Sequence, residues 1–446
     1  MKMKPQNRTM PKAVSDTITG LRTTFNKSIQ ATCEIAPYCC NDPKRDFTRK
    51  RQLPFESVIK QVLTFQNEAL QNELFDFFQN QKTAPTKSAF IQQRHKIKTE
   101  AFDFLYHNFM DNVKLKKRFL GYYLYACDGS IINLPRNPDD FSTSVSAKPG
   151  SKSYNRVNLN ALYDLVNKVY VSYRIDNGAH ARELDALYEM APSIQDPEHS
   201  ILTADRGYGY FNTIAFLANL HCHFVIRVKD TTSCTSFMRQ LNLPNSEFDK
   251  EVDIILTKSH KKQFLNDSKH LSLCSKNSFD YFDTNGFANL LFRVARFKLP
   301  SGEYETVITD LTCSEFPADA IKQIYNLRWG IETSFRDLKY ALNLVFFHSK
   351  KYNFIIQELI SRMLMYNLYS LMIQCVPDKC NPDLKYIYKA NFLASIGSLR
   401  EFFLFGNRDI LHRLLYNMNP VRPNRTVPRG NLHDTKPAKS FNYRAS

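Results

Sequence analysis

The spacing of apolar residues changes character along the chain. In residues 54–118 apolar positions recur every three or four residues, which predicts amphipathic helices. Residues 119–230 carry short apolar runs separated by turn residues, which predicts strands. Helical spacing returns at Ala318 and continues through Met372, so this later segment is expected to be helical again.

The middle region is expected to form a mixed sheet. Three strands come in succession, followed by a strand, a helix and a further strand. The expected strands are Tyr122–Cys127, Val157–Tyr163, Val169–Ile175, Ser200–Ala204 and Phe224–Val228, and the helix is Phe211–Leu220. A hairpin of Leu290–Leu299 and Tyr304–Leu311 comes later, after less regular sequence. This order is expected of an RNase H-like sheet, although order alone also allows other mixed α/β folds.

The charge balance favours a polyanionic partner. Sixty Lys and Arg residues against 43 Asp and Glu residues give a formal net charge of +17. Each cationic side chain that neutralises a phosphate also releases counterions, which favours binding to nucleic acid. Ribosomal, membrane-surface and heparin-binding proteins share this balance, so charge alone does not select DNA.

Two segments carry basic residues in settings that suit DNA. Residues 1–53 contain scattered basic residues with little apolar periodicity, which predicts a mobile basic arm or a solvated tail. A short helix expected after Thr86 carries Gln, His and basic side chains, among them Arg94 and Lys96. Such side chains suit groove edges and phosphates, so this helix is a candidate recognition element, with a solvated helical face as the alternative.

Cysteine usage and apolar stretches indicate a reducing compartment and no membrane association. The ten cysteines form no CxxC pair. The run His221–His223 resembles a metal cluster, but it leads into apolar Phe224–Ile226 and is better explained as a buried strand start. The apolar stretch Phe354–Val376 is interrupted by Gln357 and Arg362, which predicts a buried helix. We therefore expect a cytoplasmic protein.

Two aspartates end apolar strands and are closely followed by a glycine. Asp128 precedes Gly129, and Asp205 precedes Arg206 and Gly207. A strand end is a rigid mount, and glycine lets the backbone turn away, so the carboxylate can project from the edge of the sheet. Carboxylate oxygens are preferred ligands of Mg²⁺. An aspartate at a strand end is more often a turn residue or a helix cap, so the pair needs a third partner.

A helix around residue 330 supplies a candidate for that partner. Arg328, Glu332 and Lys339 follow Tyr325 by 3, 7 and 14 residues, which on a helix places the four side chains within roughly 60° of one another. In the functional interpretation Glu332 binds metal, Arg328 and Lys339 hold phosphates, and Tyr325 adds a hydrogen bond. The alternative is a surface salt-bridge ladder, because Arg328 and Glu332 form an i, i+4 pair.

The same residues resemble the signature of DDE transposases of the bacterial insertion-sequence-four family. That signature is Tyr-x2-Arg-x3-Glu-x6-Lys, and Tyr325, Arg328, Glu332 and Lys339 fill it. Asp128-Gly129-Ser130 is similar to the family's first aspartate motif, and Asp205-Arg206-Gly207-Tyr208 is similar to the second. The resemblance covers roughly residues 85–375 and is most specific around the third motif.

The resemblance implies a catalytic triad of Asp128, Asp205 and Glu332 that binds two Mg²⁺ ions, for which Mn²⁺ can substitute. It implies cut-and-paste transposition, in which the terminal inverted repeats of the element are cleaved and the freed 3′-hydroxyl attacks target DNA. The implied partners are double-stranded DNA and a second copy of the chain in a homodimer, in the nucleoid of a bacterial cytoplasm. Expected DNA-binding residues are Tyr325, Arg328, Trp329, Lys339, Arg206, Arg94 and Lys96.

We therefore predict an α/β fold in which an RNase H-like catalytic domain with a β-rich insertion is flanked by N-terminal and C-terminal helical regions. The expected divisions are a basic, largely disordered arm (1–53), a helical DNA-binding domain (54–118), the first part of the catalytic domain (119–230), the insertion (231–299), the last part of the catalytic domain with the signature helix (300–375), and a C-terminal helical region with a basic tail (376–446).

One departure from the family concerns base stacking. Some relatives hold a flipped base against a tryptophan in the insertion, whereas the single tryptophan here, Trp329, lies inside the signature helix. Phe279, Tyr281 or Phe282 could stack a base instead. Glu183 is a candidate accessory acidic residue, with an ordinary helix-capping role as the alternative.

Two other functions remain open at the level of sequence. A metal-dependent nuclease on the same fold would cut DNA without joining strands, using the same two metal ions. A DNA-binding regulator derived from a transposase would have lost catalysis. The retained carboxylates argue against the regulator.

Overall fold

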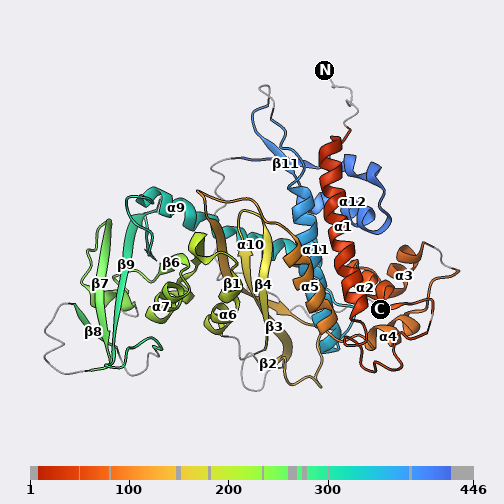
Figure 1. The fold of residues 1–446 in the computed structure, drawn as a ribbon, viewed down its shortest axis with the longest axis horizontal. Coiled ribbons are helices and arrows are strands. Elements are labelled where there is room, and N and C mark those ends of the chain that lie inside the picture. Colours follow the sequence, from red (N-terminus) through yellow and green to blue (C-terminus); the bar gives the residue numbers. More distant parts are fainter. Residues whose placement is uncertain are drawn as a thin grey trace.

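A computed structural model describes residues 9–49, 51–79, 82–146, 152–178, 182–233, 236–259, 269–273, 279–299, 302–380 and 384–422. The chain has a mixed α/β architecture, with one large sheet and a layer of helices at one end of it (Figure 1). The α/β class predicted from the sequence is confirmed. No helix in the described ranges has the length and apolarity needed to cross a membrane.

Within the described residues, ten strands form the large sheet, in the order β2-β3-β1-β5-β6-β10-β9-β7-β8, with β4 also paired to β3. The strands are β1 (Tyr123–Asn133), β2 (Ser144–Val145), β3 (Tyr154–Asp164), β4 (Val169–Asn177), β5 (Ser200–Ala204), β6 (His223–Val228), β7 (Phe248–Thr257), β8 (His270–Ser272), β9 (Phe287–Lys298) and β10 (Tyr304–Thr309).

The centre of this sheet matches the order of elements predicted from the sequence. Strands β1, β3 and β4 are antiparallel neighbours, and β5 and β6 continue from β1 in parallel. Every residue of β5 is buried, as expected for a parallel strand covered on both faces. Helices α6 (Glu183–Met190) and α7 (Phe211–Asn219) pack on one face, and α9 (Ala318–Leu327) and α10 (Trp329–Arg336) pack on the other.

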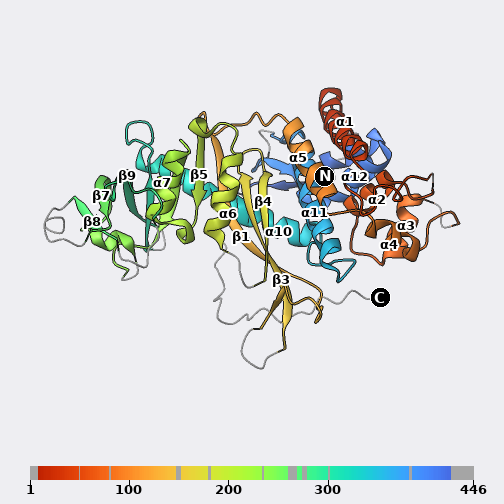
Figure 2. The same cartoon turned by 60° about the horizontal axis from the view of Figure 1, so that its bottom comes forward.

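The helical layer combines segments from both ends of the chain (Figures 1 and 2). Its helices are α1 (Lys12–Glu34), α2 (Phe55–Leu63), α3 (Leu70–Phe78), α4 (Lys87–His95), α5 (Glu100–Asn112), α11 (Tyr352–Ile373) and α12 (Phe392–Phe405). Helix α11 is buried over most of its length and forms the centre of this layer. The buried helix predicted for this apolar stretch is confirmed.

The predicted disordered arm is wrong for most of its length. Helix α1 buries Ile18, Phe25 and Ile29. The Phe25 ring lies 4.8 Å from that of Phe109 and 5.3 Å from that of Phe403, in edge-to-face contacts. A helix that buries an apolar stripe between two others is part of the fold, whatever the charge around it.

Three further predictions need correction. Strand β1 does not end before Asp128 but runs through it to Asn133, because β3 continues to pair with it. Strands β7, β8 and β9, expected as a separate insertion, extend the central sheet through β10. The signature helix is not uniform: between α9 and α10 the backbone at Arg328 stays right-handed helical but bonds to Tyr325 three residues back, and a π-helical turn, Asp337–Ala341, follows α10.

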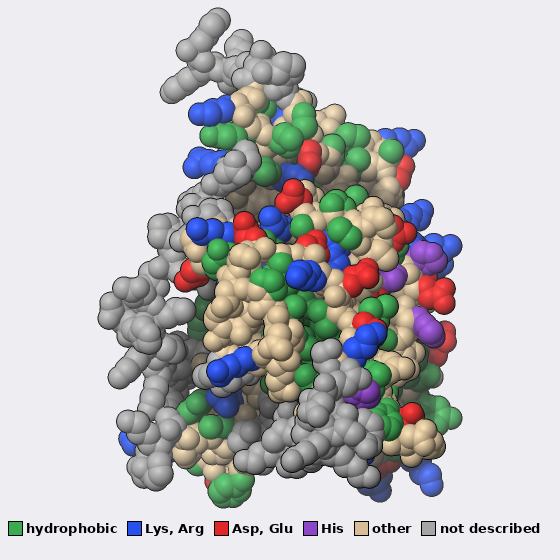
Figure 3. Space-filling model, turned by 90° about the vertical axis from the view of Figure 1, so that its left-hand side faces the viewer, with side chains coloured by type: hydrophobic (Ala, Val, Ile, Leu, Met, Phe, Trp, Pro, Cys, Tyr) green, Lys and Arg blue, Asp and Glu red, His purple; other side chains and the backbone are tan. Residues whose placement is uncertain are grey.

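The described C-terminal part adds a short pair of strands, β11 (Tyr388–Ala390) and β12 (Met418–Pro420), and a 3₁₀ helix, Arg408–Leu415. The basic tail predicted beyond residue 422 lies outside the described residues. At the β7–β8 end of the sheet, cationic and anionic side chains alternate over the visible surface (Figure 3). This face therefore has no obvious charge preference for DNA among its described residues.

Candidate active site

The two aspartates follow paired residues on neighbouring parallel strands. Cys127 of β1 is the register partner of Ala204 of β5, so Asp128 and Asp205 come next on adjacent strands. Each carboxylate accepts a hydrogen bond from the backbone N–H that follows it, at 2.8 Å for Asp128 and 2.6 Å for Asp205. The sheet thus holds both acidic groups at one edge of the β1–β5 pair.

Arg328 connects the first aspartate to Glu332. Its Nη2 donates to Glu332 Oε1 at 2.8 Å, and its Nη1 lies 3.6 Å from Asp128 Oδ2. The side chain of Arg328 is only 2% exposed, whereas that of Glu332 is 40% exposed. The structure therefore brings a carboxylate from the sheet and one from α10 around a single buried guanidinium.

Helices α9 and α10 hold this guanidinium because their apolar stripes dock on the sheet. Ile321, Ile324 and Tyr325 belong to one buried cluster, together with apolar residues of the sheet. The guanidinium carbon of Arg328 lies 5.5 Å from the Tyr325 ring centroid and 5.0 Å from that of Trp329, within the range of cation–π contacts. Its Nε has no hydrogen-bond acceptor among the described residues.

Burial, and to a smaller extent neighbouring charges, alter the ionisation of Asp128. Burial raises the pKa of Asp128 to about 6. The Gly129 amide and Arg328 act in the opposite direction, while the charges of Glu332 and Glu183 raise the pKa further. A carboxyl group with this pKa is ionised at neutral pH, and a nearby cation would stabilise its ionised form.

Sequence reasoning missed a second charged pair beside the aspartates. Glu305 of β10 pairs with Arg227 of β6 at 3.2 Å, and burial raises the pKa of Glu305. The fields of Arg328 and Asp205 also act on Glu305. Burial likewise raises the pKa of Tyr325 to about 12, and its hydroxyl has no partner among the described residues. The signal available in the sequence was one Arg or Glu within each of two otherwise uncharged and largely apolar runs, Phe224–Val228 and Tyr304–Thr309.

The other predicted DNA-binding residues differ in their surroundings. Trp329 is 40% exposed, next to Arg328. Arg206 is exposed and lines a cavity of about 390 Å³ together with Arg227. Lys339 is half-buried on the π-helical turn, and burial lowers its pKa. Lys96 lies at the end of α4 and lines a cavity of about 550 Å³ with four cationic residues, Lys44, Arg45, Arg49 and Arg51.

The prediction that Arg94 contacts DNA is wrong. This side chain is 3% exposed and pairs with Glu358 at 2.9 Å. It also donates to Gln357 Oε1 at 2.8 Å and to the carbonyl of Phe354 at 2.7 Å. These three polar contacts are all with α11, so Arg94 fastens α4 to the centre of the helical layer.

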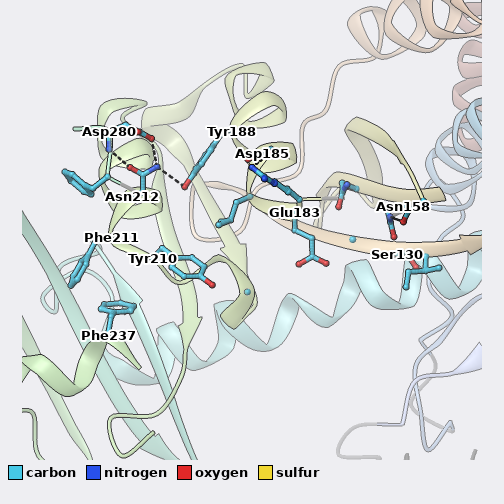
Figure 4. Close-up of a pocket in the computed structure, with 18 of the residues that line it drawn as sticks. Ser130, Asn158, Glu183, Asp185, Tyr188, Tyr210, Phe211, Asn212, Phe237 and Asp280 are labelled. Carbon is cyan, nitrogen blue, oxygen red and sulfur yellow. Dashed lines mark hydrogen bonds and ion pairs between the residues drawn. The ribbon is translucent and has the colours of Figure 1, made fainter. Parts of the chain in front are cut away.

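The candidate stacking aromatics belong to the walls of two cavities. Phe279 is buried and lines a cavity of about 1030 Å³, which also reaches Gly129, Gly207 and Glu183. Tyr281 and Phe282 line a smaller cavity, on the other side of Phe279. Figure 4 shows Glu183 extending into the large cavity between the segments that carry Ser130 and Tyr210.

Comparison with known proteins decides the family. Residues 120–368, more than half of the chain, match the family described as transposase DDE domain. The chain is a member of the DDE transposase family. A solved piggyBac transposase synaptic complex with hairpin DNA is similar to 91% of this chain and 84% of that one, at 10% sequence identity and a TM-score of 0.46. No curated protein matches by sequence.

The candidate carboxylates of this DDE transposase are the type of ligand that a hard divalent cation prefers. Asp128, Asp205 and Glu332 offer only oxygen ligands, as Mg²⁺ prefers. In the part of the chain that the structure describes, no three Asp, Glu, His or Cys side chains stand close enough to enclose one metal ion. Arg328 supplies the positive charge between Asp128 and Glu332, so a bound cation would compete with it for these carboxylates.

Proposed function

We propose that this DDE transposase cuts and joins DNA by cut-and-paste transposition, with Asp128, Asp205 and Glu332 as its catalytic residues. The observation that carries the proposal is the convergence of Asp128 and Glu332 on Arg328, beside the strand end at Asp205. We infer that the central strands form an RNase H-like sheet, which the order β4-β3-β1-β5-β6 supports. The signature Tyr325, Arg328, Glu332 and Lys339 further suggests the insertion-sequence-four group.

In this proposal the three carboxylates hold two Mg²⁺ ions, or Mn²⁺ in their stead. The ions would activate the attacking oxygen and stabilise the leaving oxygen of the phosphodiester. Asp128 and Asp205 are fixed by the sheet and by the backbone N–H groups that they accept from. The side chain of Glu332 is more exposed than that of Asp128, so Glu332 could give up its contact with Arg328 and bind a cation instead. Arg328 would then be available to a phosphate of the substrate.

The proposed partners are double-stranded DNA, at transposon ends and at the target, and a second copy of the chain. Trp329 and Arg206 are exposed near the carboxylates, and Tyr325 and Lys339 complete the signature. A further contact is proposed at the cationic cavity that includes Lys96, because five basic side chains on one concave surface suit a DNA backbone.

A supercoiled-plasmid assay tests this function. Wild-type protein with Mg²⁺ and a plasmid carrying the element's ends should release the element and insert it into target DNA. Glu332→Gln should abolish cleavage yet keep binding to the ends, since it removes one charge and preserves shape. Glu315→Gln is a matched control, because Glu315 is exposed and lies before α9.

The same assay separates the competing functions. Nicking without integration would favour a nuclease, and binding without cleavage would favour a regulator. Full activity of Glu332→Gln would refute the assignment of the triad.

A further inference from the structure

The carboxylate of Glu183 lies between the two glycines that follow the catalytic aspartates. A Cβ atom on Gly129 would stand 3.2 Å from Glu183 Oε1, and one on Gly207 would stand 3.4 Å from Glu183 Oε2. A side chain at position 129 would crowd this carboxylate, whereas one at position 207 would make only an ordinary van der Waals contact with it. Glu183 thus reaches the edge of the sheet from α6.

Asn160 directs an unpaired oxygen to the same spot. Its Oδ1 would stand 2.8 Å from the same Cβ atom on Gly129, so this oxygen and Glu183 Oε1 are at most 6.0 Å apart. The side chain of Asn160 is fully buried, and its Oδ1 has no hydrogen-bond donor among the described residues. Its Nδ2 donates to Asp176 Oδ2 at 2.9 Å, which fixes the orientation of the amide.

The two oxygens, of Glu183 and of Asn160, have no described cationic side chain paired with them. A buried carbonyl oxygen without a hydrogen-bond donor is energetically unfavourable, so it indicates that a partner is missing. Two arginines line the same cavity, but Arg156 donates to the Gly178 carbonyl at 3.2 Å and Arg182 faces Asp185 at 4.0 Å. No ion pair joins either arginine to Glu183 within the described ranges. Among the described residues Asn160 Oδ1 therefore lacks a donor, and a bound cation or its water shell could supply the missing partner.

We propose that Glu183 and Asn160 form an accessory site for a hydrated divalent cation, Mg²⁺ or Mn²⁺, beside the catalytic carboxylates. A spacing of up to 6.0 Å between two oxygens fits a cation that keeps part of its water shell, as Mg²⁺ does in proteins. The proposal rests on the proposed function for its purpose, because the added charge would act on Asp128. A cation at Glu183 would place positive charge beside the strand end that carries Asp128 and Gly129.

This site is distinct from the triad in its position. Alternation along β1 directs Ala126 to the α10 side of the sheet and Cys127 to the α6 side. Asp128 therefore faces Arg328 and α10, whereas Gly129 faces Glu183 and α6. The accessory cation would lie on the opposite face of the strand from Glu332, so the two sites can be tested separately.

Direct titration of the full-length chain with Mn²⁺, followed by electron paramagnetic resonance of the free ion, tests the site. Wild-type protein should bind an ion that Glu183→Gln binds at least about tenfold more weakly. Asp185→Asn is the matched control, since it removes a charge from the same helix and the same cavity. Glu332→Gln should retain the ion. Gly129→Ala should also weaken it, because the added methyl group fills the space, while Gly207→Ala meets only an ordinary contact.

Three results would overturn the accessory site: Mn²⁺ binding by Glu183→Gln equal to wild type, equal weakening by Asp185→Asn, or no Mn²⁺ binding by wild type. The second would mean that the cavity attracts cations only through its general negative charge. None of these depends on DNA cleavage. Failure of the proposed function would instead appear as unchanged cleavage by Glu332→Gln, so the two failures are distinguishable.

Discussion

Two clusters of charged side chains in this DDE transposase differ in whether their partners are complete. In the helical layer, His348 lies between Glu73 at 2.9 Å and Glu358 at 3.2 Å, and Arg94 closes the cluster on Glu358. Each of these side chains is almost fully buried and paired. At the active site, Arg328, Tyr325 and Asn160 each retain a buried polar atom without a hydrogen-bond partner among the described residues.

The difference indicates what each cluster is for. A closed set of buried charges holds elements together, and removal of one member leaves the others without a partner. An open set has donors and acceptors available for groups that arrive from solution, which in the proposed function are DNA phosphates and cations. The same residue types therefore serve structure in one region and chemistry in the other.

The largest effect is expected at the open cluster. Asp205→Asn should lower the rate of DNA cleavage about 10³-fold or more, since it removes a charged ligand whose contribution to the transition state is several kcal/mol. Stability should change little, because Asp205 is partly exposed at a strand end. Single-turnover cleavage and urea unfolding measure the two effects. Lost stability together with lost cleavage would contradict the distinction between the clusters.

A large loss of stability is expected at the closed cluster. Arg94→Met should destabilise the fold by about 3–5 kcal/mol, because Glu358 is left buried without its cation. The double variant Arg94→Met with Glu358→Met should recover most of this loss, as hydrophobic replacements of buried pairs often do. Urea unfolding of the three proteins measures the coupling. An unaltered single variant would show that the pair is not structural.

The two clusters should respond to pH with opposite signs. Burial raises the pKa of Glu358, but the charges of His348 and Arg94 outweigh burial and keep this pKa well below its usual value. This stability is present above about pH 4.5 and is lost as pH falls further. The pKa of Asp128 is raised from 3.8 to about 6, so its contribution to stability decreases as pH rises through that window.

Asp128→Asn should therefore stabilise the metal-free protein on the order of 1 kcal/mol at pH 7.5 and have little effect at pH 4. Unfolding midpoints over this pH range provide the measurement. Equal effects of the substitution at both pH values would contradict the raised pKa. In the wild type, cleavage should increase with pH through about 6 as Asp128 ionises.

The smallest effect is expected from a substitution of Lys96, which should change only the affinity for DNA. Lys96→Ala should weaken binding to DNA a few-fold and lower the salt dependence of binding by about one ion. It should change stability by no more than about 0.5 kcal/mol, because its pairing with Asp46 at 3.5 Å is partly solvated. Filter binding at several salt concentrations measures both quantities. A slope equal to that of wild type would exclude a phosphate contact at Lys96.

The order of the central strands followed from the sequence because apolar runs and turn residues are local signals. The extent of β1 did not, because Gly129 and Ser130 suggested a turn while pairing with β3 keeps the strand going. Arg94 also could not be assigned, since its partners Gln357 and Glu358 are 263 and 264 residues away. A basic residue on a short polar helix carries no local sign of such a partner.

Helix α1 was missed for a related reason. Its buried positions Ile18, Phe25 and Ile29 do have helical spacing, but threonine, serine and lysine surround them. The contacts that make this spacing meaningful come from α5 and α12, which the sequence alone does not reveal. The sequence marks Glu183 as a candidate acidic residue, but the feature that distinguishes it is Asn160, which becomes its neighbour only when α6 packs on β3.

The contact of α1 with the C-terminal helices has a consequence for biosynthesis. Arg22 donates from Nε to the carbonyl of Phe403 at 2.9 Å, across 381 residues of sequence. At a translation rate of about 5–20 residues per second, this acceptor leaves the ribosome roughly 20–80 s after Arg22. During that interval the apolar side of α1 that faces Phe403 is exposed, so nascent chains should need a chaperone until synthesis passes α12. The helical layer can therefore assemble fully only after the ribosome has synthesised the chain through α12.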